Sequence, residues 1–116
     1  MIYSMPYTDI DVITARNMIT DGSHPKIIIL DVRTQSEYEK GHLENSILIP
    51  VTELKSRIEE LLQFINIKII VYCHIGNRSS QASSILDSNN FTKVYNLLGG
   101  IAACESANYP VIIETQ

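Results

Sequence analysis

The chain alternates between short, continuous apolar runs and segments whose apolar residues recur at helical spacing. Continuous β-branched runs of this length predict buried parallel strands, and the helical spacing predicts helices that pack by one face. Strands are predicted at 26–32, 46–49, 68–72 and 93–96, and helices at 12–19, 35–40, 79–87 and 101–107. Strands that alternate with helices predict an α/β fold with a parallel sheet covered on both faces.

A further helix is predicted after Pro50, with Thr52 as its N-cap. Its buried face would consist of apolar residues at helical spacing: Leu54, Ile58, Leu61, Leu62 and Ile65. We interpret this stripe as core packing, and Tyr72, at the end of its strand, as a core residue as well.

Composition limits the classes of protein that fit. The 116 residues are 45% apolar and 19% charged, which indicates one globular domain over residues 1–116. A net charge of −4 without a stripe of Lys and Arg argues against a nucleic-acid partner. Neither a secretory signal nor an apolar run of ~20 residues is found, so we expect no membrane contact and a cytoplasmic location.

Two cysteines, Cys73 and Cys104, are candidates for chemistry. In a reducing compartment a structural disulfide is not expected. A metal site is not expected either, because no Cys-x-x-Cys occurs and His24, His42 and His74 are scattered. Each cysteine is therefore buried filler or reactive, and its local context must decide.

The segment 73–79, Cys-His-Ile-Gly-Asn-Arg-Ser, follows a predicted buried strand and leads into a helix. In open α/β sheets, ligands bind beyond the carboxyl ends of the strands. A thiolate at Cys73 would face the positive end of the helix dipole and the backbone N–H groups of a loop that Gly76 allows to curl. With the charge of Arg78 nearby, these effects would lower the thiol pKa below its free value of ~8.5. The alternative is that Cys73 is a small buried residue at a strand end.

Three blocks of the sequence together resemble the rhodanese-like family, from about residue 27 to 111. The first block consists of Asp31-Val32-Arg33, Glu37-Tyr38, Gly41-His42-Leu43 and Ile49-Pro50; the second is 72–79; the third consists of 96–101 and Tyr109-Pro110-Val111. The resemblance implies a central, mainly parallel five-stranded sheet flanked by helices on both faces.

The same resemblance implies a sulfurtransferase that moves a sulfane sulfur from thiosulfate or a persulfide donor to a thiol acceptor, which could be a protein. Cys73 would be the nucleophile, and Arg78 a loop-stabilising or anion-binding residue. The backbone N–H groups of the loop would cradle the sulfur; they belong to His74, Ile75, Gly76, Asn77, Arg78 and Ser79. The side chains of His74, Ile75 and Asn77 would shape the mouth of the pocket. No metal or organic cofactor is implied.

Two rival functions remain. A cysteine phosphatase or arsenate reductase also pairs a thiolate with an Arg, but its motif has five intervening residues, whereas four separate Cys73 from Arg78 here. A shorter loop suits one sulfur atom better than a tetrahedral oxyanion. The second rival is a non-catalytic module that binds a partner protein, or a sulfur relay between proteins, because fold does not determine function.

Supporting roles are expected for Asp31 and Arg33. Asp31 could hold Arg78, or instead bind Arg33 or a nearby helix N-terminus. Arg33 and Glu37 are spaced for a local ion pair, and His42 is expected to fix a turn by a hydrogen bond.

Cys104 stands where the family often has Trp. It could resolve a persulfide on Cys73 by forming a disulfide, or it could fill part of the space of the missing Trp.

Overall fold

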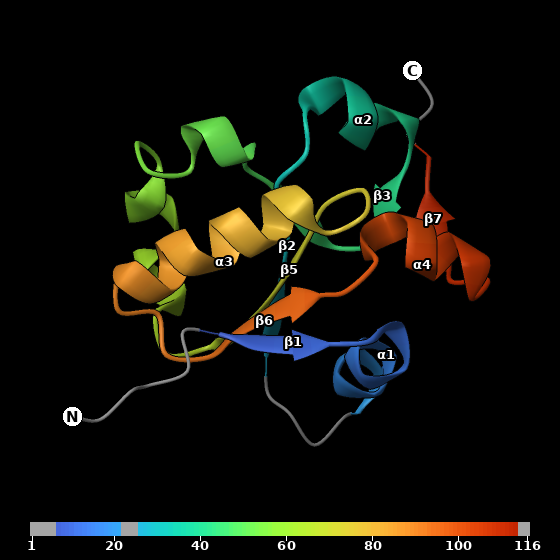
Figure 1. The fold of residues 1–116 in the computed structure, drawn as a ribbon, viewed down its shortest axis with the longest axis horizontal. Coiled ribbons are helices and arrows are strands. Elements are labelled where there is room, and N and C mark those ends of the chain that lie inside the picture. Colours follow the sequence, from blue (N-terminus) through green and yellow to red (C-terminus); the bar gives the residue numbers. More distant parts are fainter. Residues whose placement is uncertain (1–6, 22–25, 114–116) are drawn as a thin grey trace.

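A five-stranded parallel sheet runs through the centre of the molecule (Figure 1). The computed structural model describes residues 7–21 and 26–113. The strand order across the sheet is β1 (Thr8–Ile10), β6 (Val94–Leu97), β5 (Lys68–Tyr72), β2 (Ile27–Asp31) and β4 (Ser46–Leu48). All neighbouring strands are parallel. The predicted α/β fold is thereby confirmed.

Helices cover both faces of the sheet, as expected. One face carries α1 (Val12–Thr20) and α4 (Gly100–Ser106), and the other carries α3 (Asn77–Ser88) and two 3₁₀ segments, η1 (Val51–Glu53) and η2 (Ile58–Phe64). The short helix α2 (Gln35–Lys40) leads into β3 (His42–Leu43), which pairs antiparallel with β7 (Val111–Ile112). No helix in the described part of the chain is long and apolar enough to cross a bilayer.

Side chains along β5 alternate between two separate cores. Ile69 and Val71 pack on the side of α3, whereas Ile70 and Tyr72 pack on the side of α1 and α4. Each of these four side chains is at most 1% exposed. Burial on both faces explains why this strand reads as a continuous apolar run, and the alternation sends Cys73, the next residue, to the side of α3.

The prediction of an α-helix between Thr52 and Ile65 is wrong, because the segment forms 3₁₀ helix. The segment forms η1 and η2, two 3₁₀ turns, and η1 begins after Pro50 without a side-chain cap. Leu61 and Phe64 are buried, whereas Leu62 is 46% exposed. A spacing of three places residues on one side of a 3₁₀ helix, so Phe64 rather than Leu62 completes the buried face.

Further differences concern one helix boundary and the short strands. The helix α3 begins at Asn77, two residues before the predicted start at Ser79, and β1, β3 and β7 were not among the predicted strands. β1 has three residues, two of them exposed, so it lacks the apolar run by which a buried strand is found. The earlier start of α3 places Arg78 and Ser79 in its first turn, beside Cys73.

Candidate functional site: a buried cysteine in a ring of backbone N–H groups

Cys73 lies directly after β5, and its side chain is 1% exposed. Its Sγ accepts hydrogen bonds from the backbone N–H of Gly76 at 3.1 Å and of Ser79 at 3.3 Å. The thiol also lies 3.5 Å from the Ser79 hydroxyl, which in turn donates to the Gly76 carbonyl. Backbone and hydroxyl groups therefore surround the sulfur on the loop side.

The curl of the loop depends on Gly76. Its φ of +126° lies in a region that residues with a Cβ rarely adopt. This turn allows α3 to begin at Asn77 and leaves the first N–H groups of the helix without intrahelical partners. The N–H of Ser79 is one of them, and it points at Cys73 Sγ.

The hydrogen bonds outweigh burial in setting the acidity of Cys73. Burial is the largest single influence and opposes ionisation. The Ser79 hydroxyl and the N–H groups of Ser79, Gly76 and Arg78 favour the thiolate, and together they bring the pKa of Cys73 below its ordinary value. The site therefore stabilises a negative charge on sulfur.

Arg78 forms a two-pronged ion pair with Glu37, with N–O distances of 2.6 and 2.8 Å. Glu37 also belongs to the capping box of α2, because it contacts Thr34, the N-cap residue. The bond to Arg78, more than any other influence, holds the pKa of Glu37 at about 2. Arg78 thus fastens the cysteine loop to the start of α2.

The expected pairing of Arg33 with Glu37 is wrong. Arg33 binds Asp31 instead, through Nε and Nη2, at 2.6 Å for the shortest contact. Arg33 Nη2 also donates to the Gly41 carbonyl, and both charged side chains are buried. Of the alternatives left open for Asp31, the structure shows the bond to Arg33, and Glu37 takes the place at Arg78. This buried pair stiffens the connection between β2 and α2.

The N-terminus of α4 closes against the backbone of the cysteine loop. The Ile101 N–H donates to the Cys73 carbonyl at 2.9 Å, and the Ala102 N–H donates to the His74 carbonyl at 3.1 Å. A Cβ at Gly100 would collide with both of those carbonyl groups, and its φ of +57° adds a second reason for glycine. Gly100, the first residue of α4, is therefore part of the site, a role that the sequence alone did not assign to it.

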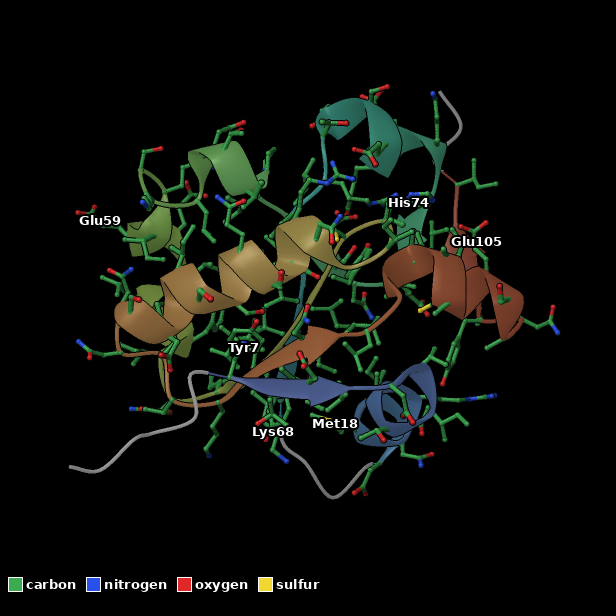
Figure 2. The ribbon with its side chains drawn as sticks, in the orientation of Figure 1. Tyr7, Met18, Glu59, Lys68, His74 and Glu105 are labelled. Carbon is green, nitrogen blue, oxygen red and sulfur yellow. The ribbon has the colours of Figure 1, made fainter. Side chains whose placement is uncertain are left out.

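The remaining loop side chains lie at the surface. His74, Ile75 and Asn77 are exposed around the buried sulfur. Figure 2 shows His74, just beyond the carboxyl end of β5, well away from Lys68, the first residue of that strand. The expected turn contact of His42 is present, because its Nδ1 lies 2.9 Å from the Tyr38 carbonyl and its ring stacks on that of Tyr38.

Cys104 lies in the other core, on the opposite face of the sheet from Cys73. Both cysteines are free thiols. Because the sheet separates the two side chains, a direct disulfide would require a large rearrangement. Cys104 packs as a small buried side chain and lines a cavity that it fills only in part.

No group of three or more His, Cys, Asp and Glu side chains that could hold a metal ion is present within 7–21 and 26–113. His24, one of the three histidines considered for a metal site, lies outside these ranges.

Comparison with known proteins identifies the family. The model of the rhodanese-like domain matches residues 13–107 of the chain. The chain belongs to the rhodanese-like domain family. The rhodanese-related protein of Thermoplasma volcanium has the same fold, with a TM-score of 0.79 and 30% sequence identity. That likeness covers 93% of this chain and 100% of that one.

Two longer relatives contain a similar segment. The tRNA uridine(34) hydroxylase of Cronobacter sakazakii is 36% identical over 81 residues, which is 66% of this chain and 23% of the relative. A probable molybdopterin-synthase adenylyltransferase of Porphyra purpurea is 35% identical over 100 residues, which is 86% of this chain and 26% of the relative. This rhodanese-like chain thus spans about a quarter of the length of the curated relatives that it matches.

Proposed function

We propose that this rhodanese-like chain is a sulfurtransferase that carries a sulfane sulfur as a persulfide on Cys73. The observation that carries the proposal is the pair of backbone N–H groups, of Gly76 and Ser79, that hydrogen-bond to Cys73 Sγ. The same groups favour the thiolate that attacks and the charged sulfur of the persulfide that forms. No cofactor is needed for this chemistry.

The reaction has two balanced steps. The Cys73 thiolate attacks the outer sulfur of the donor, a new S–S bond forms, and the donor's own bond to that sulfur breaks. The donor leaves with the electron pair, as sulfite from thiosulfate or as a thiolate from a persulfide. An acceptor thiolate then attacks the outer sulfur and releases the Cys73 thiolate, so ping-pong kinetics are expected.

Intact-mass measurement tests the proposal. Reduced protein is treated with excess thiosulfate or with a low-molecular-weight persulfide, and the reagent is removed. Wild type and Cys104→Ser should gain one sulfur atom that cyanide or dithiothreitol removes, whereas Cys73→Ser should gain none. Removal distinguishes a persulfide from a sulfinic acid, which has the same nominal mass gain. If no variant gains a removable sulfur from either donor, the partner-binding module replaces this proposal.

The charges around the loop favour a relay between thiols as the finer form of this function. Arg33 and Arg78, the two arginines of the site, are each paired with a carboxylate. A dianionic donor such as thiosulfate therefore meets little uncompensated positive charge from these side chains. We expect a persulfide to load Cys73 faster than thiosulfate does, and a protein-bound thiol to be the acceptor.

The longer relatives support the relay, because in both of them the similar segment is a quarter of a larger protein. The same charges weigh against a phosphatase, because Arg78 is already held by Glu37. A loading rate for thiosulfate that equals or exceeds the persulfide rate would refute the relay while leaving sulfur transfer in place. A reducing compartment such as the cytoplasm would suit this chemistry, since Cys73 must start as a free thiol.

A further inference from the structure

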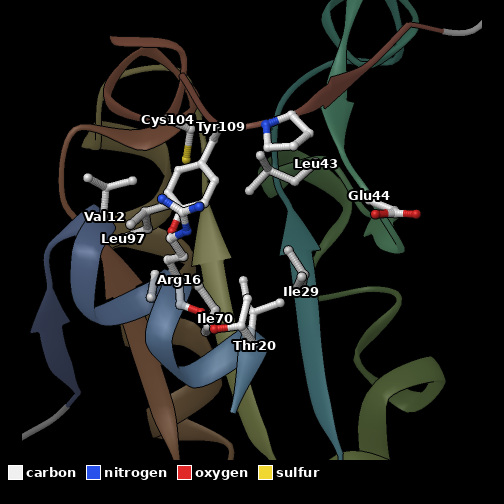
Figure 3. Close-up of a pocket in the computed structure, with 13 residues that line it drawn as sticks. Val12, Arg16, Thr20, Ile29, Leu43, Glu44, Ile70, Leu97, Cys104 and Tyr109 are labelled. Carbon is white, nitrogen blue, oxygen red and sulfur yellow. Dashed lines mark hydrogen bonds between the residues drawn. The ribbon is translucent and has the colours of Figure 1, made fainter. Parts of the chain in front are cut away.

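Two openings in the surface differ in what they offer a ligand. The cavity beside Cys104, on the opposite face of the sheet from Cys73, has a mainly apolar lining (Figure 3). A groove of about 540 Å³ lies instead beside β4, which pairs with β2 on one side and with no strand of the described residues on the other. This groove therefore adjoins the backbone of an edge strand, which can form hydrogen bonds with a second chain.

Leu48 directs its backbone groups away from the sheet. Successive residues of a strand point their N–H and C=O groups to opposite sides, so only alternate residues bond to one neighbouring strand. Ile49 is bonded to β2, because its N–H donates to the Asp31 carbonyl at 3.0 Å. The N–H and C=O of Leu48 therefore point to the free side, where Leu48 is partly exposed and lines the groove.

Tyr38 shows the same alternation two residues earlier in β4. Its hydroxyl donates to the Ser46 carbonyl at 2.9 Å, so that carbonyl also points outward and already has a partner. Within 7–21 and 26–113, the outward groups of Leu48 have none. A ligand that satisfies both must present an acceptor and a donor at the spacing of a strand, and an extended peptide does so.

The charged wall of the groove favours a basic side chain. Arg57 is bound by both Glu53 and Glu60, at 3.2 and 2.8 Å, so one negative charge is in excess on this side. The opposite wall, formed by Thr34, Gln35 and Tyr38, carries no charge. The three charged side chains are partly exposed, so the selection for Lys or Arg is modest.

The groove and the cysteine loop lie at the same edge of the sheet. Leu48, Asp31 and Tyr72 are in register across β4, β2 and β5, and Cys73 follows Tyr72. A strand added beside β4 would be three strand spacings, about 14 Å, from β5. An extended chain covers that distance in about four or five residues.

We propose that the edge at Leu48 binds an extended, basic segment of the protein whose thiol accepts sulfur from Cys73. Two backbone hydrogen bonds hold the segment, and its cysteine, four or five residues away, reaches the loop. The acceptor thiolate forms an S–S bond to the outer sulfur of the persulfide, and the bond to Cys73 breaks with release of the Cys73 thiolate. The choice of occupant rests on the proposed sulfur transfer, whereas peptide binding at Leu48 does not.

Hydrogen exchange in the free chain tests the premise. The outward N–H of Leu48 should exchange more than about tenfold faster than the N–H of Ile49, which is bonded to Asp31. Amide NMR reads both groups in one sample. Equal protection would overturn the proposal. Protection of Leu48 that appears only as the protein concentration rises would also overturn it, because it would assign the edge to a second copy of the chain.

Synthetic peptides test the site without any sulfur on Cys73. One probe is acetyl-Val-Lys-Val-Lys-Val-Gly-Ser-Gly-Cys-amide, and a second carries the linker and the cysteine at its amino end, because an added strand can run in either direction. Under reducing conditions the full chain should bind one of them with a dissociation constant below about 1 mM. Binding should shift the Leu48 amide and slow its exchange. Glutamate in place of both lysines should weaken binding about threefold.

Two variants locate the backbone contact. Leu48→Pro removes the outward N–H at a position where an edge strand tolerates proline. It should bind the probe about fivefold more weakly than Leu48→Ala, which keeps that N–H. If Leu48→Pro fails to fold, probes with an N-methyl group at one of two adjacent residues decide. One of them should bind about fivefold more weakly and the other as before, because adjacent N–H groups of a strand point in opposite directions.

Persulfide-loaded protein tests the role of the segment as the acceptor. The probe should remove sulfur from Cys73 about fivefold faster in Leu48→Ala than in Leu48→Pro, whereas β-mercaptoethanol should do so at equal rates. If Cys73 accepts sulfur from no donor, the proposed sulfur transfer fails, and peptide binding still decides the site.

The remaining outcomes separate the two parts of the proposal. No binding of either probe up to about 1 mM, shifts that leave the Leu48 amide unmoved, or equal affinity of Leu48→Pro and Leu48→Ala would overturn the peptide site. Equal rates of transfer to the probe in the two variants, despite different affinities, would refute the acceptor role.

Discussion

The two cysteines differ in acidity although both are buried. Cys73 is 1% exposed and Cys104 is 3% exposed. Burial is the largest influence on each thiol and disfavours the thiolate in both. It raises the pKa of Cys104 to about 11, with a smaller contribution from Glu105, whereas the pKa of Cys73 lies below its ordinary value.

The difference comes from the backbone that surrounds each sulfur. Cys73 receives N–H groups from a curled loop and from the first turn of α3. Cys104 lies in the middle of α4, where the backbone N–H groups bond to carbonyls of their own helix. The difference in acidity between the two thiols is therefore set by free backbone donors and not by exposure.

The largest expected effect is in thiol alkylation. At pH 7 the thiolate fraction of Cys73 should exceed that of Cys104 by more than about 10-fold, because burial raises the pKa of Cys104 to about 11 whereas the hydrogen bonds lower the pKa of Cys73. Native alkylation with iodoacetamide, followed by peptide mass spectrometry over time, measures both rates in one sample. Equal rates would mean that the N–H groups do not compensate for burial. The rates in Cys73→Ser and Cys104→Ser identify the two signals.

The next effect concerns the closure of α4 on the loop. Gly100→Ala should lower the free energy of unfolding by about 1–3 kcal/mol, because alanine is strained at this φ and its Cβ meets the Cys73 and His74 carbonyls. It should also slow sulfur loading, since the loop must shift. Urea unfolding and the mass assay measure the two effects. Ala102→Gly, a change of the same size in the same helix, should cost only about 0.5–1 kcal/mol and leave loading intact.

A smaller effect is expected at the hydroxyl beside the sulfur. When Cys73 ionises, the Ser79 hydroxyl can turn from the Gly76 carbonyl and donate to the sulfur. Ser79→Ala removes that hydrogen bond, so the pKa of Cys73 should rise by less than about one unit. The pH dependence of alkylation measures the shift. Ser80→Ala is the matched control, because that hydroxyl bonds to the Asn77 carbonyl and not to the sulfur. A shift of the same size in the control would remove the special role of Ser79.

The smallest effect concerns the ion pair that anchors the loop. Glu37→Gln keeps a residue suited to the capping box but removes the charge that binds Arg78. The pair is partly exposed, so the loss of stability should be below about 1 kcal/mol.

The pH dependence of this effect has a definite sign. The pKa of Glu37 is lowered from 4.5 to about 2, so its contribution is complete above 4.5 and is lost as the pH falls towards 2. The difference in unfolding free energy between wild type and Glu37→Gln should therefore shrink over that range in urea titrations. The freed Arg78 should also raise the thiosulfate loading rate relative to the persulfide rate. A difference that grows on acidification would contradict the proposed role of the pair.

Sequence patterns predicted best the elements whose signals are local. β5 matches its prediction at both ends, as does α2, because a continuous apolar run and a glycine that stops a helix, here Gly41, are local signals. The stripe predicted at 52–65 does pack against the core at Leu54, Ile58, Leu61 and Ile65. The α-helix and the burial of Leu62 are wrong, because helical periodicity does not separate an α-helix from successive 3₁₀ turns.

The site could be predicted only where its contacts are local. The loop around Cys73 is formed by neighbours in the sequence. The cysteine, the glycine and the start of the following helix all lie within seven residues. The pairing of Arg78 with Glu37 joins residues 41 positions apart. No local rule selects Glu37 over Asp31 as the partner of Arg78. The spacing of Thr34 and Glu37 does, however, indicate that Glu37 lies in the first turn of α2. The role of Gly100 likewise depends on a loop that is distant in sequence.

The strand order has a consequence for how the chain reaches its folded state. β1 forms ladder hydrogen bonds only with β6, and Asp9 meets its neighbour Asn96 across 87 positions of the chain. During synthesis, β1 must wait until most of this domain has emerged before its partner β6 exists. Such distant pairing makes folding slow, because a long loop must close before the contact can form. This protein should therefore fold more slowly than a helical bundle of equal length, whose contacts are local.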